Sequence, residues 1–289
     1  MRKAVAQRFA APCARSSPTL CDDRANFAAP RRTDKPIARV DFIEGLAKGL
    51  AVLESFDTER QRLNATQAAE RAGLTRAAAR RHLLTLAHLG YLETDGSHYW
   101  LAPKVLRLSG SYLASSRLPR LVQPTLNRLA LMARESFSVA VLDGLEVVIV
   151  ARSASPQAQR LLPYGLHLGT RLPAHATSTG RVLLGAMRPQ ALNAWLRGHE
   201  LQRLTPHTIV DPKALRARIE QARRDDFAVA REEHELGVLA LAVPLRDMKG
   251  STLAALNVVV SPQRMDEARL VADCLPTLAD AARELRPLL

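Results

Sequence analysis

Residues 64–101, NATQAAERAGLTRAAARRHLLTLAHLGYLETDGSHYWL, decide the fold that we predict for the amino-terminal part of this chain. The stretch begins as a short helix that Asn64 or Thr66 can cap, and Gly73 can end that helix in a left-handed conformation. A basic helix follows, and then two short strands joined at Asp95-Gly96, a pair typical of a tight hairpin turn. Helix, turn, basic helix and hairpin in this order predict a winged helix-turn-helix, which inserts its second helix into the major groove of DNA.

The basic helix, which we predict over 75–89, has one side for a neighbouring helix and one side for a ligand. Ala79, Leu83 and Leu86 recur at helical spacing and form the side that packs on the preceding helix. The helix contains three arginines and no acidic residue, whereas 37–100 as a whole contains eight basic and eight acidic residues. Because the positive charge is concentrated on one helix, the pattern favours a helix that reads DNA over a solvated basic hairpin.

The exposed side of this helix contains candidates for base and phosphate contacts. Small side chains at Ala77 and Ala78 would let the backbone approach base edges, and Arg81 is long enough to reach a guanine. Polar residues at the start of the helix are expected to hold phosphates, with help from the helix N-terminus. The candidate DNA-contacting residues are Thr75, Arg76, Ala77, Ala78, Arg80, Arg81 and Thr85 on the helix, and Ser97 and His98 at the tip of the hairpin.

The composition is that of a globular chain with an excess of basic residues. At 289 residues and a net charge of +13, the chain has room for about two domains and suits a nucleic-acid partner. An aromatic content of 4% argues against single-strand binding by base stacking. Cys13, Cys21 and Cys274 lie far apart, which indicates a reducing, cytoplasmic location and neither a disulfide framework nor a zinc site. We expect no membrane span, no secretory signal, no metal and no cofactor.

We divide the chain into four parts. Residues 1–36 are rich in Arg, Ser, Pro and Ala and are expected to form a disordered basic arm, unless they follow a wrongly assigned start codon. Residues 37–101 form the winged helix-turn-helix, and their first amphipathic helix, over 41–57, can also contact a second copy of the chain. Residues 102–119 form a linker helix that ends at Pro119.

The fourth part, 120–289, mixes helices and strands. We predict helices over about 120–135, in the later part of 173–187, and over 211–224 and 265–285, and strands over 138–144, 146–153, 227–232, 236–247 and 251–261. Antiparallel strands flanked by helices predict an α+β domain of the kind that senses small molecules.

Four stretches carry a resemblance to a known family. They are GLAKGLAVLESF (45–56), GLTRAAARRHLLTLAHLGYL (73–92), RLPAHATSTGRVLLG (171–185), and FAVAREEHELGVLALAVPLRD with its spacing to LAALNVVVSP. Over about 41–287 the chain resembles the IclR family of bacterial transcription regulators. The resemblance implies a winged helix, a linker helix and a GAF-like effector-binding domain, and dimers that often pair into tetramers.

The wording of two of these stretches is most similar to the subgroup that regulates protocatechuate and 4-hydroxybenzoate catabolism. This similarity implies that the effector is an aromatic acid or an acid from ring cleavage. Family members that bind small keto acids tend to carry polar or Cys residues where Ala230 and Ala240 align here. The two alanines therefore argue against a ligand as small as glyoxylate and leave room for a larger, flatter one.

An organic acid needs hydrogen-bond donors for its carboxylate and an apolar slot for its body. The segment 169–180 offers backbone N–H groups at a helix start, and Asn257 is a polar residue inside an apolar strand. The candidate effector-binding residues are Arg171, His175, Ala176, Thr177, Ser178, Ala240 and Asn257. Simpler roles compete with these: a surface ion pair for Arg171, a hydrogen-bonded loop position for His175 and a strand-edge cap for Asn257.

The acidic run Glu232, Glu233 and Glu235 with His234 looks at first like a metal site. Consecutive residues on a strand or turn point to opposite faces, so we predict a solvated run instead. Trp195 and Met187 are predicted to be core residues.

Three classes of function compete. The first is a transcription factor whose contact with a double-stranded DNA operator responds to a small organic acid. The second is an enzyme built on the carboxy-terminal domain, although the chain contains no GxSxG, P-loop, HExxH or GxGxxG motif. The third is an architectural DNA binder, which would need no sensor domain. We expect the first, in a homodimer or dimer-of-dimers tetramer, with RNA polymerase as a further candidate partner and no contact with membranes.

Overall fold

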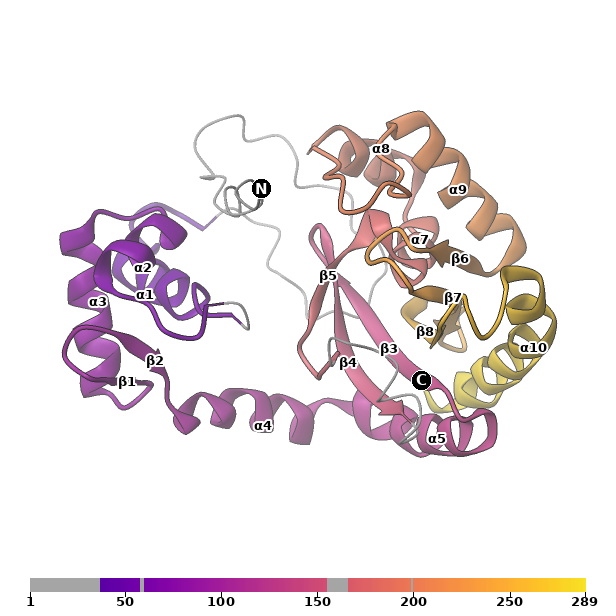
Figure 1. The fold of residues 1–289 in the computed structure, drawn as a ribbon, viewed down its shortest axis with the longest axis horizontal. Coiled ribbons are helices and arrows are strands. Elements are labelled where there is room, and N and C mark those ends of the chain that lie inside the picture. The colour runs from indigo at the N-terminus through magenta and orange to yellow at the C-terminus, as the bar shows by residue number, and fades with distance from the viewer. Residues whose placement is uncertain (1–36, 58–59, 155–165, 199) are drawn as a thin grey trace. The chain divides into compact units, whose positions relative to one another are not determined.

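The structure is a computed structural model that describes residues 37–57, 60–154, 166–198 and 200–289. Within these residues the chain folds as two compact units, one that ends at Ser115 and one that begins at Ser116. Figure 1 labels the helices and strands of both units. The basic arm that we predicted over 1–36 lies outside the described residues.

The amino-terminal unit is a winged helix-turn-helix, as the sequence predicted. It contains α1 (Glu44–Leu53), α2 (Ala65–Ala72), α3 (Arg76–His88) and a hairpin of β1 (Leu92–Thr94) and β2 (Tyr99–Leu101). Ala79 and Leu83 of α3 are fully buried, and Leu86 packs at the edge of the same core. The predicted apolar stripe of the basic helix is therefore the side that holds α3 on the other helices.

Local hydrogen bonds fix where these helices begin and end. The side chain of Asn64 accepts hydrogen bonds from two backbone N–H groups of α2, and the Gln67 side chain accepts one from Asn64 N at 2.9 Å. This capping box satisfies N–H groups that have no partner inside the helix. Gly73 ends α2 at a φ of 64°, and Thr75 Oγ1 accepts from Ala78 N at 3.3 Å where α3 starts. The turn between the helices is thus encoded locally.

The hairpin turn is held by one carboxylate. Asp95 Oδ1 accepts hydrogen bonds from the backbone N–H of His98 at 2.7 Å and from the backbone N–H of Ser97 at 2.9 Å. The bond from His98, followed by those from Ser97, stabilises the charged form and lowers the pKa of Asp95 to about 2. β2 also pairs at Tyr99 with Leu63, which attaches the hairpin to the start of α2.

The linker differs from the prediction. A short 3-10 turn, Pro103–Val105, leads into α4 (Leu106–Ser115), and α5 (Arg117–Ala133) begins after a break at Ser116. We predicted one helix ending at Pro119. Instead, Pro119 lies in the first turn of α5, where its missing N–H costs no helical hydrogen bond.

The second unit is built on a six-stranded antiparallel sheet with the strand order β5-β4-β3-β8-β7-β6. The strands are β3 (Ser136–Asp143), β4 (Glu146–Ala154), β5 (Arg171–Pro173), β6 (Ala228–Arg231), β7 (Leu239–Arg246) and β8 (Thr252–Val260). The helices after α5 are η2 (Ala174–Ala176), α7 (Ser178–Gly185), α8 (Pro189–Arg197), α9 (Pro212–Asp225), α10 (Glu267–Leu285) and η3 (Arg286–Leu288). No helix among the described residues combines the length and apolar character needed to cross a bilayer.

Alternation along the strands gives the sheet two different faces. Phe137 and Val139 of β3 point into a core of large aliphatic side chains against α5 and α10. Ser138 and Ala140 alternate with them and face the side that α7, α8 and α9 cover (Figure 1). The neighbouring strands also place small side chains on this second face, namely Ala230, Ala240, Ala242 and Ala255. Because these side chains are small, the second face leaves room for a cavity.

Candidate functional sites

α3 presents an exposed cationic surface. Arg76, Arg80 and Arg81 are exposed, and no carboxylate within the described ranges pairs with any of them. Ala77 is exposed and Ala78 is half-buried, so the start of the helix is narrow between these long side chains. The surface can therefore approach a polyanion closely without first breaking an ion pair.

The other predicted DNA contacts already make hydrogen bonds within their own elements. Thr85 Oγ1 donates to Arg81 O at 2.9 Å, so its hydroxyl can only accept from a ligand. At the tip of the hairpin, Ser97 Oγ contacts both Asp95 Oδ1 and His98 Nδ1 at 2.9 Å. These bonds hold the tip in one conformation before any contact with DNA.

Arg62 is a further cation beside the hairpin, which the sequence analysis missed. Its guanidinium lies over the Trp100 ring, 4.3 Å from the ring centroid. The same indole donates from Nε1 to Glu93 Oε2 at 2.8 Å. This cation–π contact orients Arg62 on the surface of the unit. No local sequence pattern could have indicated it, because the contact joins residues that are far apart in the chain.

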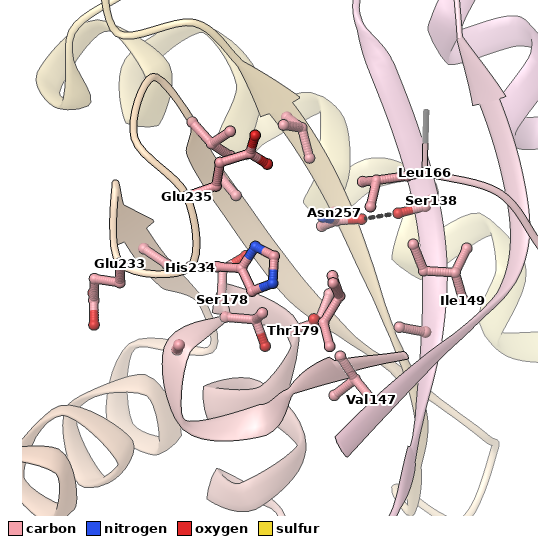
Figure 2. A pocket seen from close by; sticks show the side chains of 18 residues that line it. Ser138, Val147, Ile149, Leu166, Ser178, Thr179, Glu233, His234, Glu235 and Asn257 are labelled. Carbon is pink, nitrogen blue, oxygen red and sulfur yellow. Dashed lines mark hydrogen bonds between the residues drawn. The ribbon is translucent and has the colours of Figure 1, made fainter. Parts of the chain in front are cut away.

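In the second unit, a cavity lies between the sheet and the start of α7 (Figure 2). The cavity has a volume of about 60 Å³, compared with about 10–15 Å³ for a cavity that holds a single water. The cavity therefore accommodates a small organic molecule. Its lining consists of Ser138, Ala140, Val147, Ile149, Leu166, Leu172, Ala176, Thr177, Ser178, Thr179, Ala230, Glu233, His234, Glu235, Val238, Ala240, Asn257 and Val259.

One polar wall of the cavity is the start of α7. Thr177 Oγ1 caps the helix by accepting from Gly180 N at 3.1 Å, so the earlier N–H groups of Ser178 and Thr179 have no acceptor in the helix. Ser178 Oγ is buried and has no hydrogen-bond partner among the described residues. An unsatisfied buried hydroxyl costs about 1–3 kcal/mol, so an oxygen atom of a ligand would be stabilised here.

Gly180 explains how this wall is built. A Cβ at Gly180 would lie 2.0 Å from Ala174 O, a distance that a real side chain does not reach. The glycine therefore lets η2 pack directly against α7. At this position the absent side chain leaves room for the chain itself and not for a ligand.

A second polar pair lies on the sheet. Ser138 of β3 and Asn257 of β8 are register partners, and Ser138 Oγ donates to Asn257 Oδ1 at 2.5 Å (Figure 2). Asn257 lies inside β8, which has paired strands on both sides, so it does not cap a strand edge. Within the described ranges the amide NH2 of Asn257 has no partner, and it is free to donate to a ligand.

The acidic run after β6 is not a solvated segment, so that prediction was wrong. Glu233, His234 and Glu235 all line the cavity. The strand ends at Arg231 and Glu232 adopts a φ of 53°, so the chain turns here and brings the three following side chains to the cavity. No group of three or more His, Cys, Asp or Glu in the described part of the chain is arranged to hold a metal ion.

This cavity loop, residues 232–238, is anchored from two sides. Glu233 is buried and forms an ion pair with Arg181 of α7, which also donates to Val229 O at 2.9 Å. Thr208 Oγ1 donates to Glu233 O at 2.7 Å, and Thr205 Oγ1 donates to Glu232 O at 2.6 Å. The cavity loop is therefore held in a fixed position against α7.

Two predicted effector contacts do not line the cavity. Arg171 is on the surface strand β5, where its guanidinium donates to Glu146 Oε2 at 2.6 Å and to Asp143 Oδ2 at 2.8 Å. His175 is buried, and its Nε2 donates to Gln202 O at 2.9 Å. Arg171 thus forms the surface ion pair and His175 the loop hydrogen bond that we gave as their simpler roles. The predicted residues that do line the cavity are Ala176, Thr177, Ser178, Ala240 and Asn257.

Family models match both units. The model of the IclR helix-turn-helix domain matches residues 45–96, and the model of the bacterial transcriptional regulator IclR C-terminal domain matches residues 110–286. Together they cover most of the chain, and each falls on the part of the chain that contains one candidate site.

Individual proteins agree with this assignment. The chain is 49% identical to the Pca operon regulatory protein of Acinetobacter baylyi, over 89% of this chain and 93% of that protein. It is 48% identical to the p-hydroxybenzoate hydroxylase transcriptional activator of the same organism, over 91% and 97%. A solved inducer-binding domain of a PobR double mutant from Acinetobacter, in complex with 3-hydroxybenzoic acid, is 45% identical over 59% of this chain and 98% of that domain, with a TM-score of 0.56. The chain belongs to the IclR family of bacterial transcriptional regulators.

Proposed function

We propose that this regulator binds a double-stranded DNA operator under the control of a small aromatic acid or an acid from ring cleavage. The observation that carries the proposal is the cavity of the second unit, which has an apolar interior and polar groups on separate walls. The similar proteins support it, because their names refer to a pca operon, to p-hydroxybenzoate hydroxylase and to a bound hydroxybenzoic acid.

The chemistry of the walls suits an aromatic acid. A carboxylate at the start of α7 would accept from the N–H groups of Ser178 and Thr179 and from the Ser178 hydroxyl. Val147 and Ile149 offer apolar contacts to a ring, and the free amide of Asn257 offers a hydrogen bond to a ring substituent. Ala230 and Ala240 keep the space wide enough for a ring, as expected from their small size.

For the DNA contact, we propose that Arg81 reads a base edge and that Arg76 and Arg80 hold phosphates. All three are exposed on α3 and free of ion pairs with described carboxylates. Thr75, Ala77, Ala78, Thr85, Ser97 and His98 remain candidates for the same interface. We keep Arg62 as a candidate phosphate contact beside the hairpin.

We also propose that the protein acts in the cytoplasm as a homodimer or a pair of dimers, without catalytic activity and with RNA polymerase as a candidate partner. α1, the two residues before it and α4 leave apolar side chains exposed that a second copy can cover. These are Phe42, Ile43, Leu46, Leu50, Leu106, Leu108 and Tyr112. Two copies would present two α3 helices to successive major grooves of one operator. An effector changes operator affinity only if it binds one arrangement of the dimer more tightly than the other.

Calorimetric titration of the full chain with hydroxybenzoates tests the effector proposal. Replacing Ser178 by alanine should weaken binding about 10- to 150-fold, because hydrogen bonds to a charged group contribute about 1.5–3 kcal/mol. Ser136→Ala is the matched control, since Ser136 Oγ is also buried and unpartnered among the described residues but lies outside the cavity. Equal affinity of Ser178→Ala and wild type for the acid would show that the ligand carboxylate does not bind at the start of α7. Failure of all tested aromatic and ring-cleavage acids to bind wild type would refute the proposal.

A further inference from the structure

His234 projects into the cavity from the loop after β6. Figure 2 shows its imidazole ring directed into the space that Ser178 and Thr179 of α7 also line. Neither ring nitrogen has a hydrogen-bond partner in the described part of the chain. A half-buried imidazole without partners can hydrogen-bond a ligand, because each nitrogen can donate or accept according to its protonation state.

The backbone that carries His234 is fixed. The preceding residue, Glu233, is paired with Arg181 and accepts a hydrogen bond from Thr208 at its carbonyl. The side chain of Glu232, two residues before His234, accepts from Gly237 N at 2.9 Å, which closes the cavity loop on itself. The imidazole therefore points into the cavity from a rigid support, as a ligand-binding residue should.

The charged groups around the ring are few and mostly balanced. Arg181 offsets the charge of Glu233, and His175 holds its Nε2 proton against Gln202 O. Glu232 of the same loop is paired with Arg231 and accepts from Gly237 N, and burial raises the pKa of Glu235. Burial, and secondly repulsion from His175, lowers the pKa of His234, so its ring is neutral at neutral pH.

We propose that His234 hydrogen-bonds the carboxylate of the bound acid and takes up a proton from solvent as that acid binds. The inference rests on the proposed function of the same cavity. A carboxylate within hydrogen-bond distance stabilises the imidazolium form and offsets the cost of burying either charge alone. The proton goes to the free ring nitrogen, and no covalent bond of the ligand changes.

Because the ring has a higher pKa in the complex than in the free protein, the complex holds more protons. Affinity therefore rises as pH falls through the interval between the two pKa values, by up to about tenfold per pH unit. Above the pKa of the complex, proton uptake ceases and the protonation of His234 no longer makes the affinity depend on pH.

The test is titration calorimetry of the full chain with 4-hydroxybenzoate between about pH 6 and pH 8, in buffers of different ionisation enthalpy. The ligand itself does not change charge in this range, since its carboxyl and phenol groups titrate below and above it. Wild type should take up a substantial fraction of one proton, and His234→Gln should take up none and lose the pH dependence. The exposed His207 on the same unit provides the matched control, so His207→Gln should behave as wild type. The neutral analogue 4-hydroxybenzamide should bind wild type without proton uptake.

Binding of 4-hydroxybenzoate to wild type without proton uptake would overturn the role of His234 and leave the aromatic-acid effector standing. Equal proton uptake by wild type and His234→Gln would also overturn it. Absence of binding by every acid tested would instead refute the proposed function and this inference together. The wild-type buffer series and the benzamide control decide the question even if His234→Gln fails to fold.

Discussion

Replacing Glu233 with glutamine removes the counter-charge of a buried arginine. The side chains of Arg181 and Glu233 are only 3% and 8% exposed, so water cannot replace the lost partner. Breaking a buried pair in this way costs about 3–5 kcal/mol of unfolding free energy. For a domain of this size, each kcal/mol lowers Tm by about 2–4 °C. The transition of the second unit should therefore fall by about 6–20 °C.

Differential scanning calorimetry of the full chain measures this shift, and the exposed pair of Arg128 and Glu284 supplies the matched control. These side chains are 48% and 55% exposed, and such surface pairs contribute about 0–1 kcal/mol. Glu284→Gln should lower Tm by a few degrees at most. Adding Arg181→Met to Glu233→Gln should restore part of the loss, since the unpaired charge is then gone. Equal Tm shifts for Glu233→Gln and Glu284→Gln, or no recovery of Tm in the double variant, would show that burial of the Arg181–Glu233 pair does not have the predicted effect on stability.

Three further perturbations test other parts of the molecule. Arg81→Ala should weaken operator binding by about 1–3 kcal/mol with little effect on random DNA, whereas Arg80→Ala should weaken binding to both DNAs alike. Fluorescence anisotropy measures both affinities. If Arg81→Ala lost equal affinity for operator and random DNA, Arg81 would be a phosphate contact. Gly180→Ala should cost at least about 1–3 kcal/mol by overpacking, because its Cβ would lie 2.0 Å from Ala174 O; a denaturant midpoint equal to that of wild type would contradict this packing. Burial, opposed by Arg264, raises the pKa of Glu135, so the stability from its protonated form is lost as pH rises through that raised pKa. Glu135→Gln should therefore be more stable than wild type at neutral pH and lose that advantage in acid, and urea unfolding at the two pH values would show the opposite if the carboxylate were stabilising.

The winged helix was predictable because its signals are local. The cap at Asn64, the left-handed turn at Gly73 and the hairpin turn at Asp95 each depend on residues within a few positions in sequence. The apolar stripe of α3 follows from helical spacing alone. For this reason the order of elements in residues 64–101 agreed with the structure.

The two faces of the sheet were only partly predictable. Alternation indicated strands, but it did not show which face is covered by large side chains and which by small ones. The pairing of Ser138 with Asn257 depends on the register between β3 and β8, whose residues are far apart in sequence. Asn257 could be predicted as a site residue because it interrupts an apolar strand, whereas nothing in the sequence around Ser138 distinguished it from other strand residues.

The errors at the effector site share one cause. Arg171 finds its partners Asp143 and Glu146 across strands, and no spacing rule predicts such a pair. His234 and its acidic neighbours were expected to be a solvated run, although Glu232 turns the chain and directs the run into the cavity. Tertiary contacts therefore decided which polar side chains face a ligand.

The most direct test of the account is the affinity of the full-length protein for its operator, measured with and without saturating 4-hydroxybenzoate or another acid shown to bind the cavity. We expect the acid to change the operator Kd several-fold or more in wild type, and Ser178→Ala to need a higher concentration of acid for the same change. An operator Kd that stays the same when the cavity is demonstrably filled would contradict the account.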